Sequence, residues 1–391
     1  MLIKFKKINY SMLFVYFYIL DVYTFPALKI SSTINTFALY SLFGIGVLNV
    51  IIRLKQIKIY SYTKWYVIFI AWSVFSCLYA YDFNVAFNSI YNLLVVLGIT
   101  IGIVYIIKST NDIENIFICF SLSGLILFLI MVFTNQLSTD SRLGNELFGN
   151  ANTLALLIMI SLICSFWLII YSKKQMKIIC FFTILSELYM LSLSGGRKFF
   201  VIPILFLYLI LISKTNKKRQ RKIIIKTIIV VFVVVVAYHI MINVPIIYNH
   251  IGHRMESLVE ALLGKGQLNN SDYVRTMMIR RGWELSSLKP ILGYGINNYY
   301  LISCFNTYSH NNFIELLVNL GLIGFIIYYY FYVYLLVKLW NLNKFDKKYR
   351  DFLIGFIISL IILETGVVTY NIPLIQIFLA IGSWLLINGK K

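Results

Sequence analysis

Long apolar runs separated by short polar segments dominate this chain. A helix needs about 20 apolar residues to cross a hydrocarbon core, and about twelve runs approach that length. The pattern predicts an all-α polytopic membrane protein with about 12 transmembrane helices. The predicted spans are residues 10–28, 33–52, 65–81, 86–107, 116–135, 152–171, 176–193, 198–213, 223–243, 313–339, 352–369 and 372–388.

The composition excludes a water-soluble globule. Of the 391 residues, 60% are hydrophobic and only 13% are charged, whereas a soluble domain carries about 25% charged residues. The mean hydropathy is +0.82. Five cysteines are present without a CxxC pair, so neither a disulfide framework nor a zinc site is indicated.

The net charge of +20 predicts the orientation of the spans. Lys and Arg lie mostly between the apolar runs, and about 25 of the 35 cations fall on one side when the spans alternate. Short loops rich in Lys and Arg stay cytoplasmic, so we expect both termini to be cytoplasmic. The positive charge therefore indicates topology and contact with anionic membrane lipids, and no nucleic-acid partner is expected.

One connection is much longer than the others. Residues 244–312 are predicted to lie outside the membrane, between a first group of nine spans at 1–243 and a last group of three at 313–391. Long loops in compact proteins are usually functional. This loop is expected to hold two short amphipathic helices on the outer membrane surface, at 253–263, where Gly264 ends the helix, and at 272–288, with Ser271 as N-cap.

Four acidic residues fall within predicted spans, where a charge costs at least about 2.5 kcal/mol and calls for a partner or a function. These are Asp21, Glu187, Glu315 and Glu364. Asp21 and Glu364 are interpreted as structural groups paired inside the bundle. Glu315 lies four residues from both Asn311 and Asn319, which places the three side chains on one helical stripe.

Cations also occur on the predicted outer side, against the orientation rule. The turn Ser194–Lys198 holds Arg197 and Lys198 beside two glycines, which suits an anion such as phosphate because arginine and the turn's amides can both donate hydrogen bonds. The alternative is an ordinary turn with snorkelling cations. Of Arg275, Arg280 and Arg281 in the second loop helix, at least two are expected to face solvent or headgroups.

His310 stands where the long loop meets the next span. An imidazole titrates near neutral pH and can act as a general base, although a single histidine is more often structural or incidental. No second ligand stands at metal-like spacing from it, so we expect no metal site.

The order of four short motifs resembles the bacterial O-antigen ligase and polysaccharide polymerase superfamily. The motifs are R-L-G at 142–144 with F-G-N-A-N at 148–152, S-G-G-R-K at 194–198, Arg275 with P-I-L-G-Y-G at 290–295, and H-N at 310–311 followed by E-L-L at 315–317 and G-L-I-G at 321–324. The last is the most specific. Together they cover about residues 140 to 325.

The resemblance implies a GT-C-like glycosyltransferase in the bacterial cytoplasmic (inner) membrane. Its donor would be an undecaprenyl-diphosphate-linked oligosaccharide, used on the outer face without metal or other cofactor and with inversion at the anomeric carbon. Arg197 and Arg275 would stabilise the leaving diphosphate and His310 would act as base, with Glu315 or Asn311 orienting the imidazole. Further substrate-binding residues would be Arg142, Asn152, Arg254, Gly293 and Gly295.

The acceptor distinguishes two functions within this superfamily. A polymerase joins the chain to another lipid-linked repeat unit, whereas a ligase transfers the finished glycan to a lipid or protein. We favour an O-antigen or capsule polymerase that works with a flippase and a chain-length regulator. The alternative outside the enzyme class is a transporter of the same lipid-linked sugar, but twelve-span transporters often show two similar halves, and the long loop occurs here once. A receptor or scaffold would not account for the outer arginines.

Overall fold

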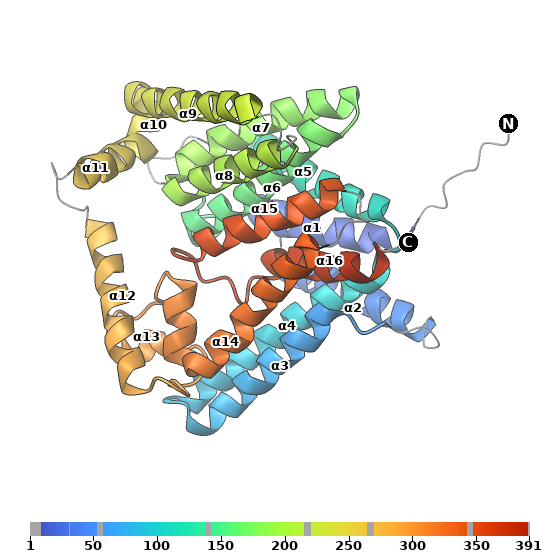
Figure 1. Cartoon of the computed structure of the whole chain (residues 1–391), viewed down its shortest axis with the longest axis vertical. Helices are drawn as coiled ribbons and strands as arrows, with labels where there is room; N and C mark the ends of the chain where they lie inside the picture. Colours follow the sequence, from blue (N-terminus) through green and yellow to red (C-terminus); the bar gives the residue numbers. More distant parts are fainter. Residues whose placement is uncertain are drawn as a thin grey trace.

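The computed structural model describes residues 9–30, 32–52, 58–137, 142–214, 220–263, 270–341 and 347–389. These residues form helices and no strand, as Figure 1 shows. The main helices are α1 (Met12–Leu28), α2 (Ser32–Ile52), α3 (Ser61–Ser76), α4 (Phe83–Ile106), α5 (Thr110–Phe133), α6 (Ala151–Tyr171), α7 (Lys174–Ser194), α8 (Arg197–Ser213), α9 (Gln220–Asn243), α14 (Asn312–Trp340), α15 (Lys347–Leu363) and α16 (Pro373–Asn388). The shorter ones are η2 (Cys77–Tyr79), α10 (Pro245–Ile247), η3 (Tyr248–Gly252), α11 (His253–Leu262), α12 (Asn270–Leu288) and α13 (Tyr299–Ile302).

Each of the twelve predicted spans overlaps one of the main helices. Six of them, α4 to α7, α9 and α14, are long and apolar enough over their described residues to cross a membrane. This agrees with a polytopic membrane protein. The other six fall short of that standard over the residues described, so the count of twelve spans stays a prediction.

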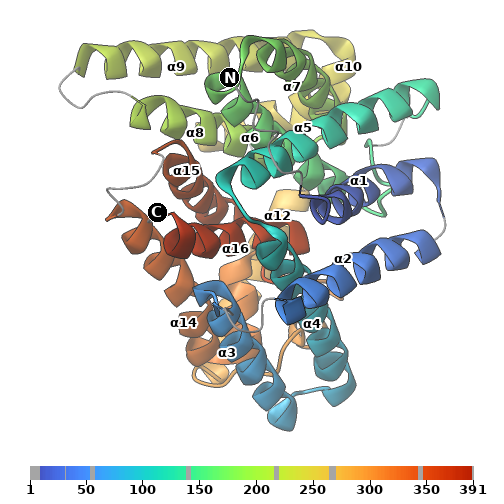
Figure 2. The same cartoon turned by 90° about the vertical axis from the view of Figure 1, so that its right-hand side faces the viewer.

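The core lies around α6, which packs on α5, α7 and α8 and is buried along nearly its whole length. Aromatic rings fill the space beside it, with the Phe117 ring stacked 4.2 Å from that of Phe352. By contrast, α9 lies at the edge of the bundle in both views (Figure 2) and exposes apolar side chains such as Phe232. An apolar helix exposed in this way suits contact with lipid.

The helices of the long connection lie at one end of the bundle. In Figure 1, α11 and α12 lie on the side opposite the marked C-terminal end. The positive-inside pattern predicts that this side is extracytoplasmic.

The loop before α13 packs into a break in α14. Gly321 interrupts the helix with φ of 64° and ψ of −170°, and the loop pairs with the freed backbone through Tyr294 N to Val318 O at 2.9 Å and Leu322 N to Pro290 O at 2.8 Å. A Cβ on Gly293 would lie 2.6 Å from Gly321 N. The motifs at 290–295 and 321–324 are therefore two sides of one packing contact.

Several predicted helix boundaries differ from the structure, and two of them change the place of a residue singled out in the sequence. The second loop helix, α12, begins at Asn270, so Ser271 lies within it and is not its N-cap. The span predicted to reach residue 369 ends at Leu363. Glu364 therefore lies just past α15, where its carboxylate accepts hydrogen bonds from Tyr329 at 2.9 Å and Tyr332 at 2.8 Å.

The other acidic residues of the predicted spans differ in their partners. The Glu187 carboxylate accepts a hydrogen bond from Ser161 in the buried core. Asp21 is also buried, but its Oδ1 has no hydrogen-bond partner among the described residues. The pairing that we expected for Asp21 is thus not found for that oxygen.

Candidate active site

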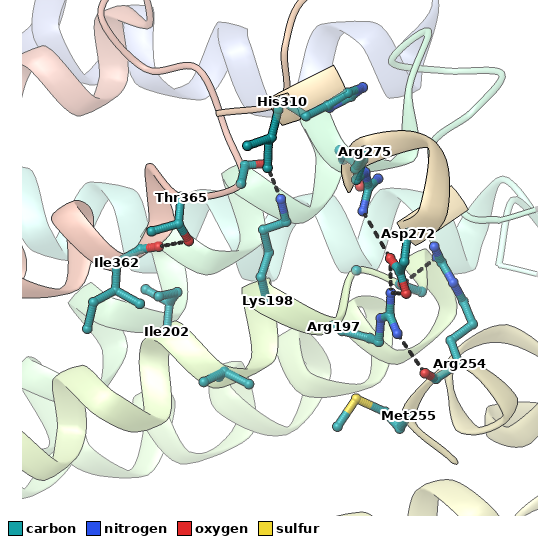
Figure 3. A pocket seen from close by; sticks show the side chains of 16 residues that line it. Arg197, Lys198, Ile202, Arg254, Met255, Asp272, Arg275, His310, Ile362 and Thr365 are labelled. Atoms are coloured by element: carbon teal, nitrogen blue, oxygen red, sulfur yellow. Dashed lines mark hydrogen bonds and ion pairs between the residues drawn. The ribbon is translucent and has the colours of Figure 1, made fainter. Parts of the chain in front are cut away.

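A cavity of about 500 Å³ opens between the α7–α8 turn, α8, α11 and α12. The segment before α14 and the segment after α15 also contribute to its lining. Among the residues that the structure describes, four cationic side chains, one carboxylate and one imidazole line it (Figure 3). These are Arg197, Lys198, Arg254, Arg275, Asp272 and His310. The charge of the cavity is therefore positive, and the cavity brings together residues from all four motifs.

Asp272 organises the arginines of the cavity. Its two carboxylate oxygens each accept a hydrogen bond of 2.6 Å from Arg197, and Arg275 Nη1 lies 3.8 Å from Oδ1. Figure 3 shows both guanidinium groups directed at this carboxylate. Because Asp272 and Arg275 are three residues apart on α12, they share one helix face. The ion pair with Arg197 thus ties α12 to the start of α8.

The turn at Gly195 fixes two further arginines. Gly195 has a φ of +68°, and a Cβ there would lie 2.7 Å from His250 O, so both its conformation and its close packing favour glycine. The carbonyl oxygens of this turn accept hydrogen bonds from Arg142 Nε at 2.7 Å (Ser194 O) and Arg254 Nη1 at 2.9 Å (Gly195 O).

The sequence suggested that the amides of this turn would bind an anion. The Gly195 amide instead donates to Ser192 O. An anion could still bind at the start of α8, since the first amides of a helix have no intrahelical acceptor.

The four cationic side chains of the cavity, which we call the cationic wall, have Arg142 and Asn152 beside them. Arg142 Nη2 donates to Asn152 Oδ1 at 3.3 Å, and Asn152 lines the cavity. Burial first, and then the neighbouring charges of Arg254 and Arg275, lower the pKa of Arg142 to about 10. The guanidinium groups are thus close enough to repel one another, and an anion bound among them would relieve that repulsion.

His310 presents a neutral imidazole to the cavity. Its ring lies 4.2 Å from that of Tyr308, and within the described part of the chain no protein hydrogen bond engages either ring nitrogen. Burial lowers its pKa to about 4, with further contributions from Arg275 and Lys198. The imidazole is therefore unprotonated at neutral pH and able to accept a proton.

Asn311 and Glu315 support the backbone around His310. Asn311 Oδ1 caps α14 by accepting from Phe313 N at 3.0 Å, and Glu315 Oε2 accepts from Ser309 N at 2.7 Å. Neither forms a hydrogen bond to the imidazole, contrary to our expectation from the sequence. They hold the chain on both sides of His310, which has a φ of 55°.

Gly293 and Gly295 do not line the cavity. They lie in the loop that packs against α14, where Gly295 N donates to Asn319 O at 2.8 Å. Arg280 and Arg281 both pair with Glu284 on the exposed face of α12, as we expected for at least two of the three arginines of this helix.

Two charged residues of the cavity were missing from the sequence-based site. Lys198 follows Arg197 directly, and its Nζ donates to Gly366 O across the cavity. Asp272 lies three residues before Arg275, a spacing that favours ion pairs on a helix and could have been noticed. Its main partner, Arg197, is 75 residues away in the sequence, and the sequence gives no sign of that contact.

Part of the chain matches a known protein family. Residues 179–329 match the family model described as O-Antigen ligase. The chain carries an O-antigen ligase-like domain. The matched segment includes Arg197, Arg254, Arg275 and His310, whereas Arg142 and Asn152 precede it. A search of curated proteins found no match to the chain.

Proposed function

We propose that this protein is a glycosyltransferase that polymerises undecaprenyl-diphosphate-linked oligosaccharide repeat units into surface polysaccharide. The reaction would take place on the outer face of the bacterial cytoplasmic membrane. The observation that carries the proposal is the meeting of Arg197, Arg275 and His310 in one cavity of an O-antigen ligase-like domain.

The cationic wall suits a diphosphate. Lys198 and Arg275 line the cavity beside the N-terminus of α8, and a helix N-terminus favours negative charge. Arg197 forms an ion pair with Asp272. We therefore assign two roles to Arg197, anchoring α12 and stabilising the anion. Guanidinium groups can bind phosphate oxygens bidentately.

An apolar flank of the same cavity suits a lipid-linked donor. Val201 of α8 and Ile362 of α15 line the cavity and remain 51% and 44% exposed. These two helices pack together and α8 is a predicted span. A polyprenyl chain could therefore leave the cavity sideways into the hydrocarbon, while its diphosphate stays at the cationic wall.

The proposed chemistry is a displacement at the anomeric carbon. The acceptor hydroxyl oxygen forms a bond to that carbon, the bond from the carbon to the diphosphate oxygen breaks, and the diphosphate leaves with the electron pair. The neutral imidazole of His310 takes the hydroxyl proton. Fixed cations stabilise the charge that develops on the leaving group. Attack opposite the leaving group would invert the anomeric centre, and no step calls for a metal.

The experiment that tests this function uses His310→Ala in the producing cell, with surface glycan separated by gel. His239→Ala, which changes an exposed histidine on α9, is the matched control. A polymerase variant would lose the ladder of chain lengths and leave single capped repeats. Polymer accumulating on the carrier lipid would indicate a ligase, and an unchanged ladder in a well-inserted variant would remove His310 from the mechanism.

A further inference from the structure

A second pocket, of about 530 Å³, lies beside the proposed catalytic cavity. It is formed by η3, α11, the start of α12 and the loop that carries Arg142. Side chains that line it include Arg142, Asn249, His250, His253, Arg254 and Asn270. We call it the side pocket.

The side pocket and the cavity share Arg254. Its Nη1 donates to Gly195 O, which belongs to the cavity wall, and its Nη2 donates to Ser271 Oγ at 3.3 Å. Ser271 lines the side pocket and is followed by Asp272, which lines the cavity. A ligand held at the cavity therefore lies one side chain away from the side pocket.

The lining of the side pocket combines cations with uncharged hydrogen-bonding groups. Among the described residues, no carboxylate lines it. The nearby acid of α11, Glu256, accepts a hydrogen bond of 2.7 Å from Tyr248 and does not face the pocket. Asn249 and Asn270 supply both donors and acceptors, which suits sugar hydroxyls, while Arg142 and Arg254 favour a negatively charged group.

Within the described ranges, two neighbouring arginines, Arg142 and Arg254, form no ion pair with a carboxylate. They donate hydrogen bonds to carbonyl and hydroxyl oxygens, such as Ser194 O for Arg142 and Ser271 Oγ for Arg254. Burial lowers the pKa of Arg254, Arg197 and Arg275 lower it further, and the Asp272 carboxylate offsets only part of this. An oxyanion placed here would stabilise both guanidinium groups.

We propose that the side pocket binds a sugar that carries an oxyanion substituent, a carboxylate or a phosphate, within the glycan that the enzyme transfers or extends. This inference rests on the proposed function, because it places the sugar next to the diphosphate site. It makes Arg142 a specificity-determining residue for acidic repeat units.

The test measures binding to the full-length protein in detergent by titration calorimetry. The probes are tetragalacturonate, glucose 6-phosphate and neutral maltotetraose. We expect at least one acidic probe to bind about tenfold more tightly than maltotetraose, a difference of roughly 1.4 kcal/mol. Tighter binding of tetragalacturonate indicates a carboxylate, and tighter binding of glucose 6-phosphate indicates a phosphate.

Two variants test whether the acidic probe binds in the side pocket. Arg142→Gln keeps a hydrogen-bond donor but loses the charge, and His253→Ala removes an exposed side chain that lines only the side pocket. Both are expected to weaken the acidic probe about fivefold or more, whereas His239→Ala leaves its affinity unchanged. Equal affinity for neutral and acidic probes, no binding at all, or full affinity in both variants would overturn the inference.

Binding of inorganic diphosphate tests the proposed function independently of the side-pocket inference. We expect His253→Ala to bind diphosphate as the unmodified protein does, and Arg275→Ala to bind it more weakly. If diphosphate binds in this way but acidic sugars show no preference, only the side-pocket inference fails. If diphosphate does not bind at all, the proposed function fails.

Discussion

The pKa of the His310 imidazole depends on the groups around it. Burial and the charges of Arg275 and Lys198 hold its pKa near 4 in the free protein, so the imidazole is neutral across the physiological range. A bound diphosphate would offset both cations and raise that pKa toward the ordinary value of about 6.5. The imidazole would then be a stronger base when the donor is present.

This argument predicts a split between two pH profiles. The acid limb of kcat/KM reports the free enzyme and the limb of kcat reports the substrate complex. We therefore expect activity to be lost at low pH in both, with the kcat limb at the higher pH. Initial rates measured between about pH 4 and 8 locate the acid limbs of kcat and kcat/KM. Coincident limbs would show that the donor does not change the environment of His310.

Asp272 competes with the anion that the cavity is proposed to bind. Asp272→Asn leaves Arg197 without its carboxylate, and breaking a buried ion pair by removing one partner costs about 3–5 kcal/mol at most. The variant should melt at a lower temperature in detergent yet bind inorganic diphosphate more tightly, about fivefold. Glu284→Gln, on the exposed face of the same helix, is the control. Weaker diphosphate binding by Asp272→Asn would contradict a displaceable carboxylate.

At the scale of elements, the α7–α8 turn tests how strictly the site depends on close packing. Gly195 and Gly149 have nearly the same φ, +68° and +66°, but a Cβ would meet His250 O at 2.7 Å in the first and nothing within 4 Å in the second. Both alanine variants carry the strain of a left-handed residue, about 1–2 kcal/mol. Gly195→Ala should lose activity at least tenfold more than Gly149→Ala, measured as polymer formed at equal protein levels. Equal losses would mean that strain alone matters.

Helix positions were largely predictable, whereas some ends were not. The apolar runs locate helices such as α5 and α6 because hydrophobic length and period are local properties. The early end of α15 depends on the Glu364 carboxylate finding Tyr329 and Tyr332 of another helix. The start of α12 at Asn270 likewise differs from the cap expected at Ser271. For α15, tertiary hydrogen bonds accompany the early end, and a single sequence does not display them.

At the scale of the whole molecule, alternation of charge predicted which helix ends share a side. The cavity residues come from ends that the pattern assigns to the outer face, and the motif resemblance then allowed residues as distant as Arg197 and His310 to be proposed together. The roles of Asn311 and Gly293 could not be anticipated in this way. Their importance lies in backbone contacts across helices, which spacing along the chain does not reveal.

The predicted topology determines which cysteine side chains an impermeant reagent can reach from outside the cell. Cys304 is exposed near the cavity end of the bundle, so a variant in which it is the sole cysteine should react with an impermeant maleimide in intact spheroplasts. A Ser172→Cys variant, at the turn between α6 and α7, should react only after the membrane is permeabilised. The reverse pattern would invert the orientation and place the cavity in the cytoplasm.

The central claim is that the cationic cavity drives glycosyl transfer from a lipid diphosphate. The most direct measurement is release of polyprenyl diphosphate by purified protein from a defined lipid-linked repeat unit, in the presence of chelator. The unmodified protein and Arg280→Ala, which changes an exposed arginine on α12, should turn over alike. Arg275→Ala should be slower by about 10²–10³, as for loss of one transition-state donor. Full activity of Arg275→Ala, or complete inhibition of the unmodified protein by chelator, would contradict this account.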